Sequence, residues 1–372
     1  MNISYNWLKE YIQIEESPEE LSVILTDLGL EIGGFKKVQS IVGGLEGLVV
    51  GEVKDKWQHP NADKLSCTKV DVGVGELLNI VCGAPNVDKG QKVIVATVGT
   101  ILFSGNDNFK IKKSKLRGEL SEGMICAEDE IGLGKSHDGI LILPNDVPVG
   151  TLAKDYFNVE EDYILEVDIT PNRADALSHY GVARDLAAYY QFNGKSVKPS
   201  FPELKKLDKI ADLPISISIE DKKACTRYSG ITIKGVTVTE SPDWLQKRLV
   251  AIGLVPINNI VDVTNYVMFE LGQPLHAFDY SICGSEIKVK SDLDGTDFIT
   301  LDGEQRTIKS GELMICNSTE PMCIAGVFGG EKSGVSHETK DIFLESAYFN
   351  PVSVRKTSKR HGLKTDASYR FE

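Results

Sequence analysis

The sequence predicts an α+β protein of several domains, with an all-β region between two segments of mixed helix and strand character. Its 372 residues exceed the size of one ordinary domain and argue for two or three. The hydrophobic pattern changes from a helical period to a period of two near Leu45, and it becomes helical again after Gly150. The middle of the chain is therefore expected to be a β domain with α/β flanks.

The first 40 residues predict a capped helix. Ser17 can cap it, Pro18 suits the first helical position, Glu20 completes a capping box and Gly29 ends it. The apolar face of this helix consists of Leu21, Ile24, Leu25 and Leu28. The same scheme is predicted to recur from Ser241-Pro242 to Gly253.

The β region is predicted from four runs with a period of two, separated by Pro, Gly, Asn and Asp. These runs are EGLVVGEV, LSCTKVDV, LLNIVC and KVIVATV, and their spacing suits a small barrel or sandwich. Beside Phe109 the chain concentrates positive charge in Lys110, Lys112, Lys113, Lys115 and Arg117. This basic strip is typical of an edge that follows nucleic-acid phosphates, although a solvated edge strand explains it nearly as well.

After Gly150, Leu165–Asp175 is predicted to run from a strand into a turn, and a helix follows until about Asn193. Lys195–Pro214, with three prolines and many lysines, is predicted to be a linker.

A helix ending in a polar cluster is predicted within Asn258–Asp279. Apolar residues recur at helical spacing until Gly272 and Pro274 stop the helix. Thr264, Asn265 and His276 can then converge near its end and form a pocket wall. The alternative is that Thr264 bonds back to its own helix while the other two satisfy loop carbonyls.

Glu345 lies in an alternating strand, on the same face as Phe343 and Ala347, so a buried face would oblige the carboxylate to find a partner. An exposed edge strand is the alternative. The glycines Gly326, Gly329 and Gly330 would let the backbone approach a ligand closely, although they form neither a P-loop nor a dinucleotide fingerprint.

Composition limits the classes of function. The net charge of −13 requires any nucleic-acid contact to be local. No apolar run is long enough to cross a membrane, and the start of the chain is no secretory signal, so we expect a cytoplasmic protein. Seven cysteines without a CxxC pair predict free thiols, and six scattered histidines give no metal spacing.

Four stretches carry a family resemblance. His59–Gly73, Ile80–Val87 and Ser114–Gly132 resemble the tRNA-binding oligonucleotide-fold (OB-fold) domain carried by several synthetases. NNIVDVTNYVMFELGQPLHAFD, at Asn258–Asp279, resembles the editing-domain signature of the bacterial phenylalanyl-tRNA synthetase β subunit. The likeness to that family extends over essentially all 372 residues.

The resemblance implies a domain plan. It places 1–40 and 151–200 in one discontinuous α/β domain, 41–150 in an inserted OB-fold β-barrel that binds tRNA, and 210–372 in an α+β editing domain of B3/B4 type. It also implies that the chain is the N-terminal portion of a β subunit, truncated at its C-terminal end.

The resemblance further implies a function. The chain would bind tRNA(Phe) and hydrolyse tyrosine wrongly attached to it, while the α subunit of an α2β2 heterotetramer carries out aminoacylation. ATP and Mg²⁺ would serve the full enzyme, with no cofactor or metal in this segment. Two alternatives remain: a non-catalytic tRNA-binding module, and a small-molecule enzyme that uses the glycine-rich loop on a phosphate.

Matched position by position, the resemblance implies an editing site. Its catalytic residues would be Thr264, Asn265, His276, Glu345 and Thr365, and its substrate-binding residues Ala325, Gly326, Gly329 and Ala367. Glu345 would accept the tyrosine hydroxyl. His276 has no assigned carboxylate partner, so a positioned water is expected to attack the ester rather than one activated by a strong general base.

Overall fold

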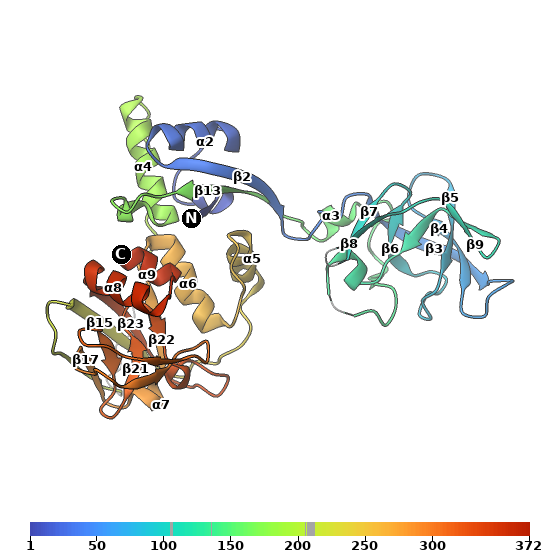
Figure 1. Ribbon diagram of the computed structural model, residues 1–372. Helices are drawn as coiled ribbons and strands as arrows, with labels where there is room; N and C mark the ends of the chain where they lie inside the picture. Colours follow the sequence, from blue (N-terminus) through green and yellow to red (C-terminus); the bar gives the residue numbers. More distant parts are fainter. Residues whose placement is uncertain (105–106, 135, 205, 207–212) are drawn as a thin grey trace. The chain divides into compact units, whose positions relative to one another are not determined.

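The computed structural model describes residues 1–104, 107–134, 136–204, 206 and 213–372 (Figure 1). They form two compact units: unit 1 is Met1–Lys36 with Tyr163–Glu372, and unit 2 is Lys37–Asp162. The linker predicted at Lys195–Pro214 lies partly outside the described residues. No helix in the described part of the chain is both long and apolar enough to span a bilayer.

The flanks of unit 2 share one small sheet, in the strand order β1-β13-β2, in which β1 and β13 are antiparallel. The elements of this region are β1 (Asn2–Ser4), α1 (Tyr5–Leu8), α2 (Pro18–Asp27), β2 (Glu31–Gln39), β13 (Glu161–Asp168), η2 (Ala174–Ala176) and α4 (His179–Phe192). Helix α2 has the predicted capping box between Ser17 and Glu20, with Pro18 in its first turn. That helix prediction is confirmed.

Unit 2 is a nearly closed barrel. Its main sheet has the order β11-β6-β3-β4-β5, and β12 also pairs with β6. A hydrogen bond of 2.7 Å from the Glu122 amide to the Asn79 carbonyl connects the two ends of this sheet. The elements are β3 (Leu48–Gln58), β4 (Ser66–Asp71), β5 (Leu77–Cys82), β6 (Lys92–Thr97), β7 (Ile101–Ser104), β8 (Asp107–Lys110), β9 (Ser114–Leu116), β10 (Glu119–Ser121), β11 (Gly123–Ile125), η1 (Asp129–Ile131), β12 (Ile142–Leu143) and α3 (Ala153–Tyr156).

The rest of unit 1 contains two further main sheets, a five-stranded one ordered β14-β17-β20-β21-β22 and a three-stranded one ordered β15-β23-β16. Their strands are β14 (Ser216–Ile219), β15 (Cys225–Ile233), β16 (Leu275–Asp279), β17 (Glu286–Lys290), β20 (Met314–Cys316), β21 (Pro321–Ile324), β22 (Phe328–Gly329) and β23 (Ile342–Phe349). The other elements are α5 (Asp243–Ala251), α6 (Asn259–Leu271), α7 (Tyr280–Cys283), β18 (Asp297–Ile299), β19 (Gln305–Thr307), η3 (Glu331–Ser333), α8 (Pro351–His361) and α9 (Asp366–Phe371).

Helix α6 confirms the prediction for Asn258–Asp279. The Asn258 side chain caps it, and Gly272 ends it with a φ of +83°, a conformation that favours glycine. The helix predicted from Ser241-Pro242 to Gly253 is confirmed as α5, but the predicted cap is wrong. Pro242 occupies the N-cap of α5, and the Ser241 hydroxyl donates instead to the buried Asp262 carboxylate at 2.5 Å. A tertiary hydrogen bond has replaced the local cap.

The hydrophobic cores of unit 1 do not follow the predicted domain borders. Leu245, Leu249, Met268 and Phe269, from α5 and α6, belong to the same core cluster as the N-terminal helices and strands. A second cluster is formed mainly by residues of the sheets β14-β17-β20-β21-β22 and β15-β23-β16. The predicted fold class is confirmed, whereas separate domains at 1–40 with 151–200 and at 210–372 stay a prediction.

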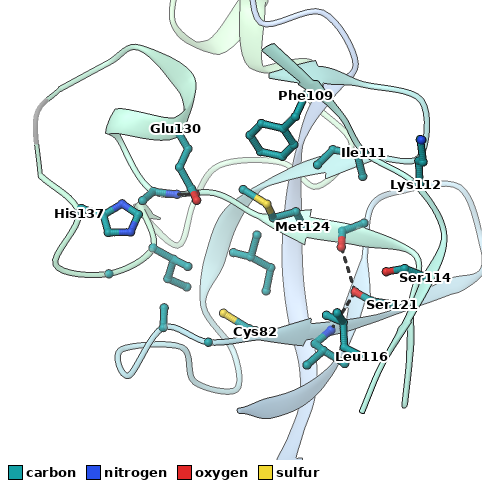
Figure 2. Close-up of a pocket in the computed structure, with 18 of the residues that line it drawn as sticks. Cys82, Phe109, Ile111, Lys112, Ser114, Leu116, Ser121, Met124, Glu130 and His137 are labelled. Carbon is teal, nitrogen blue, oxygen red and sulfur yellow. Dashed lines mark hydrogen bonds between the residues drawn. The ribbon is translucent and has the colours of Figure 1, made fainter. Parts of the chain in front are cut away.

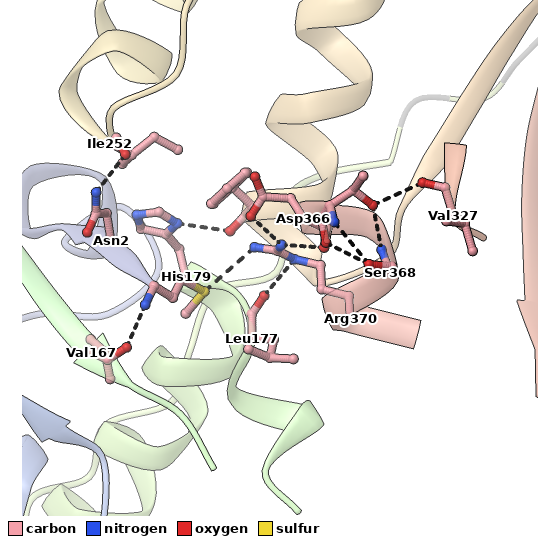
Figure 3. A network of polar contacts seen from close by, with 12 residues as sticks. Asn2, Val167, Leu177, His179, Ile252, Val327, Asp366, Ser368 and Arg370 are labelled. Atoms are coloured by element: carbon pink, nitrogen blue, oxygen red, sulfur yellow. Dashed lines mark hydrogen bonds and ion pairs between the residues drawn. The ribbon is translucent and has the colours of Figure 1, made fainter. Parts of the chain in front are cut away.

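Polar contacts also join the N-terminal region to later parts of unit 1 (Figure 3). The Arg370 guanidinium donates to the Leu177 carbonyl at 3.2 Å, and the Asn2 amide donates to the Ile252 carbonyl at 2.8 Å. The buried His179 imidazole contacts the Phe269 carbonyl at 2.9 Å. These bonds connect the end of α5 to β1, α6 to the start of α4, and α9 to the residues just before α4.

Candidate functional site

Unit 2 contains a cavity of about 730 Å³ on its barrel (Figure 2). Phe109, Ile111 and Lys112 lie along one side of it, Met124 lies near its centre, and Glu130 and His137 lie at the opposite side. The remaining lining residues are Val81, Cys82, Gly83, Ala84, Pro85, Lys110, Ser114, Leu116, Ser121, Gly123, Ile125, Ala127, Asp138, Gly139 and Ile140. An aromatic ring, apolar side chains and cations together suit a nucleotide base with its phosphate.

Two of the three stretches that resemble a tRNA-binding domain line this cavity, and the third contacts its border. Ile80–Val87 and Ser114–Gly132 supply most of its lining. His59 follows the end of β3 directly, and its imidazole contacts the carbonyl of Leu116 at 3.0 Å. The Asn61 amide donates to the Arg117 carbonyl at 3.2 Å. The first stretch therefore holds the end of the basic strip in place.

The basic strip is exposed, but it is not one continuous face. Lys110 and Lys112 line the cavity, while Lys115 lies on β9 between two lining residues and is not among them. Successive residues of a strand point to opposite sides, which explains this division. The Lys113 ammonium forms an ion pair with the Glu122 carboxylate at 2.7 Å. Lys113 is thus already engaged within unit 2.

In unit 1, Glu345 lies on the central strand of the sheet β15-β23-β16 and is only 5% exposed. The exposed-edge alternative is therefore wrong for this residue. The carboxylate accepts a hydrogen bond of 2.6 Å from the phenol hydroxyl of Tyr228, which is also buried. Phe278, Phe343 and Ala347 belong to the core cluster around them. This carboxylate is hydrogen-bonded in an apolar environment.

His276 is the direct cross-strand partner of Glu345. Facing residues of an antiparallel pair point to the same side of the sheet, so the two side chains share one face. The His276 Nε2 atom is buried without a hydrogen-bond partner among the described residues. Burial lowers the pKa of His276 to about 4, so its imidazole is neutral near pH 7. Its unpaired nitrogen is available to a ligand or a water.

Gly329 gives the His276 ring its space. A Cβ atom at position 329 would lie 2.8 Å from the His276 Cε1 atom, closer than an ordinary contact. Gly326 differs, because a Cβ there would meet the rings of Phe349 and Phe371 at 2.9 and 3.1 Å. The two glycines predicted to bind substrate therefore have different surroundings. Gly329 adjoins His276, whereas Gly326 packs against aromatic rings of the core.

The other predicted site residues have no direct contact with Glu345 or His276 among the hydrogen bonds of the described residues. The Thr365 hydroxyl caps α9 and donates to the Val327 carbonyl at 3.0 Å, in the loop that contains Ala325 and Gly326 (Figure 3). The Thr264 hydroxyl donates to Val261 of its own helix at 2.7 Å, as the alternative interpretation held. Asn265 is partly buried, and Ala367 packs against the N-terminal core cluster. Their places in a substrate site stay predictions.

The sequence interpretation missed Tyr228. Its only signal was the alternation of YSGITI, which does not reveal that Tyr228 reaches Glu345 diagonally across the pairing of β15 with β23. Burial is the main cause that raises the pKa of Tyr228 well above its ordinary value, so its hydroxyl remains a donor.

The described residues do not fit a metal site, because their His, Cys, Asp and Glu side chains do not gather in groups of three or more. All seven cysteines are buried and unpaired with one another. Burial raises the pKa of Cys225 to about 11 and that of Cys283 to about 12, which keeps both as thiols.

The buried Glu345 predicts a pH-dependent stability. Burial raises its pKa from 4.5 to about 7, so its contribution is fully present below pH 4.5 and is lost as pH rises through 7. At about 1.4 kcal/mol per pKa unit, the loss is about 3 kcal/mol. Glu345→Gln keeps an acceptor for Tyr228 without ionising. Relative to wild type, this variant is expected to gain about 3 kcal/mol in unfolding free energy between pH 4.5 and 8.

Denaturant unfolding of both proteins across that range measures this difference. The contribution of His276 has the opposite sign, since it is lost as pH falls from 6.5 through about 4. It is present in both proteins and cancels. A difference that stays constant with pH would contradict the burial of an ionisable Glu345.

Comparisons with known proteins identify the family of the two regions that contain these candidate sites. Residues 48–152 match the family described as a putative tRNA binding domain, and residues 224–372 match the B3/4 domain family. The phenylalanine–tRNA ligase beta subunit of Bacteroides fragilis is 60% identical over all of this chain and 46% of its own length. The chain belongs to the phenylalanine–tRNA ligase β-subunit family.

The phenylalanine–tRNA ligase beta subunit of Porphyromonas gingivalis is 56% identical, again over all of this chain and 46% of its own length. The chain therefore spans about half the length of the β subunits it matches. Among solved structures, an N-terminal fragment of the phenylalanyl-tRNA synthetase beta subunit from Pyrococcus horikoshii has 16% identity and a TM-score of 0.30, covering 55% of this chain and 62% of that one.

Proposed function

We propose that the chain is the part of a phenylalanine–tRNA ligase β subunit that binds tRNA(Phe) and removes tyrosine wrongly attached to it. Hydrolysis of the ester by water would release tyrosine and restore the tRNA hydroxyl. A synthetic site shaped for phenylalanine rejects an analogue with one added hydroxyl only weakly, by about 10² in a comparable enzyme, so a second site that requires this hydroxyl is useful.

The observation that carries this proposal is the contact between Tyr228 and Glu345. A phenol hydroxyl donates to a carboxylate inside an apolar face, which is the contact that a tyrosine substrate would make. A carboxylate has about four lone-pair positions, so it can accept a second phenol beside Tyr228. Phenylalanine would leave that position unpaired. The site therefore favours tyrosine by its chemistry rather than by size alone.

The remaining roles follow from position. His276, on the same face as Glu345, would hold the attacking water or the ester through its unpaired Nε2. Asn265 and Thr365 would contact the ester and the terminal adenosine, as the family resemblance implies, and Thr264 would be a further catalytic residue. Ala325, Gly326, Gly329 and Ala367 would border the amino acid. The ribose hydroxyl of the tRNA would assist the water.

In unit 2, the cavity and the basic strip would hold tRNA by its phosphates and by a stacked base. The partner of the complete β subunit would be the α subunit, in an α2β2 heterotetramer in the cytoplasm, which uses ATP and Mg²⁺ for aminoacylation. We propose no cofactor for this segment, as the family resemblance implies.

Deacylation by the complete two-subunit enzyme tests this function. Wild type is expected to release tyrosine from Tyr-tRNA(Phe) much faster than phenylalanine from Phe-tRNA(Phe). His276→Ala should slow both releases by about tenfold to a hundredfold, because an ordered water is lost, while the preference for tyrosine is retained. His337→Ala, at an exposed histidine of unit 1, is the matched control and should have no effect. Wild type that binds tRNA but releases no tyrosine would instead indicate a tRNA-binding module.

A further inference from the structure

Unit 1 has a cavity of its own, of about 380 Å³, which helix α8 borders. Three cations line it: Arg355 and Lys359 from α8, and Lys364 from the turn that follows. Arg355 and Lys359 are four residues apart and therefore lie on the same side of the helix. Thr365 and Ser368 of α9 line the same cavity. The cavity thus has a basic rim beside the start of α9.

These three cations are exposed and form no ion pair within the described residues. Their neighbours behave differently. Arg360 and His361 both contact the buried carboxylate of Glu312, at 2.7 and 2.9 Å. Cations in a last turn also stabilise a helix through its dipole, but Arg355 lies in the second turn, too far from the end for that effect. The cluster therefore has no internal electrostatic role that accounts for Arg355.

The cavity adjoins the proposed ester site through Thr365. This residue lines the cavity, and its hydroxyl donates to the Val327 carbonyl in the loop between Ala325 and Gly329. Gly329 in turn makes room for His276. The basic rim is therefore connected to the proposed hydrolytic groups by a short run of contacts, on a chain whose overall charge is −13.

We propose that Arg355, Lys359 and Lys364 bind the backbone phosphates of the single-stranded 3′ end of the tRNA that carries the ester. This inference rests on the proposed function. A single strand carries one phosphate for each nucleotide, and exposed cations beside a cavity can follow it without reading the base sequence. Glu372 also lines the cavity, so the anionic strand would lie along the three cations and away from that carboxylate.

The test uses the complete two-subunit enzyme and two substrates that differ in phosphate. Tyr-tRNA(Phe) carries the full 3′ strand, whereas the tyrosine ester of adenosine carries no phosphate. The variant is Arg355→Gln with Lys359→Gln. The control is Lys222→Gln with Lys223→Gln, which removes the same charge from exposed positions of unit 1.

For Tyr-tRNA(Phe), the variant is expected to lower kcat/KM about tenfold. It should also flatten the slope of log kcat/KM against log salt by about 1.4. Each of the two lost single-strand phosphate contacts accounts for about 0.7 of this change. Its rate on the adenosine ester should equal that of the control, which also shows that the variant is folded.

Other results overturn the proposal in distinguishable ways. If the variant equals the control on both substrates, the cations do not contact the strand, and the proposed function stands. If the variant is slow on both, the two residues support the hydrolytic site itself rather than the phosphates. If wild type releases tyrosine from neither substrate, the proposed function fails and this inference fails with it.

Discussion

Replacing Glu345 with Ala is expected to reduce the preference for tyrosyl over phenylalanyl ester by up to about 10⁴-fold. A site built to pair a substrate hydroxyl discriminates by about 10⁴ to 10⁵, because the analogue without it leaves a buried polar group unsatisfied. With alanine, neither substrate finds an acceptor, and apolar shape alone remains. The rate on tyrosyl ester should fall far less than the preference, because His276 stays in place.

The measurement is deacylation of Tyr-tRNA(Phe) and Phe-tRNA(Phe) by the complete enzyme. Glu345→Gln is the matched variant, since its amide oxygen still accepts a hydrogen bond, and it should keep part of the preference. Tyr228→Phe keeps the carboxylate and tests whether its orientation depends on the 2.6 Å contact. An unchanged preference in Glu345→Ala would leave Glu345 as a structural residue of its strand.

Neutralising the free part of the basic strip is expected to remove most of the salt dependence of tRNA binding. Changing Lys110, Lys112, Lys115 and Arg117 together to Gln should flatten the slope of log affinity against log salt by about 3.6, or about 0.9 for each phosphate contact. Between 50 and 200 mM salt, wild type would then lose about a hundredfold more affinity than the variant.

Lys113→Gln is the internal control for this experiment, because the Lys113 ammonium already pairs with Glu122. It removes a positive charge from the same strip and should leave the slope almost unchanged. Equilibrium titrations of tRNA(Phe) at several salt concentrations give both slopes. Equal slopes for wild type and the four-residue variant would show that the strip is only a solvated edge.

Local signals in the sequence were sufficient for the elements that depend on neighbouring residues. The capping box of α2 and the helix end at Gly272 both involve residues within a few positions of each other. The alternation of β23 also identified the face that carries Glu345. The fold class followed from such patterns, together with the change of period at each end of the β region.

The contacts of the candidate site could not be predicted, because they join residues far apart in the sequence and leave no local pattern. The bond between Tyr228 and Glu345 spans 117 residues, and Ser241 prefers Asp262 to the start of its own helix. Likewise, the ion pair between Lys113 and Glu122 divides a strip that looked continuous in the sequence. In each case a tertiary partner decides what a polar side chain does. Periodicity and spacing cannot identify that partner.

The strands that carry the chain out of unit 1 and back are neighbours in one sheet. β2 ends at Gln39 and β13 begins at Glu161, and the Gln39 amide donates to the Glu161 carboxylate at 2.9 Å. Hairpin loops of two to five residues are common, so a short turn could join these strand ends. The barrel is therefore an insertion between neighbouring strands. The proposed tRNA-binding part can vary in sequence or length while the proposed editing part keeps its own connectivity.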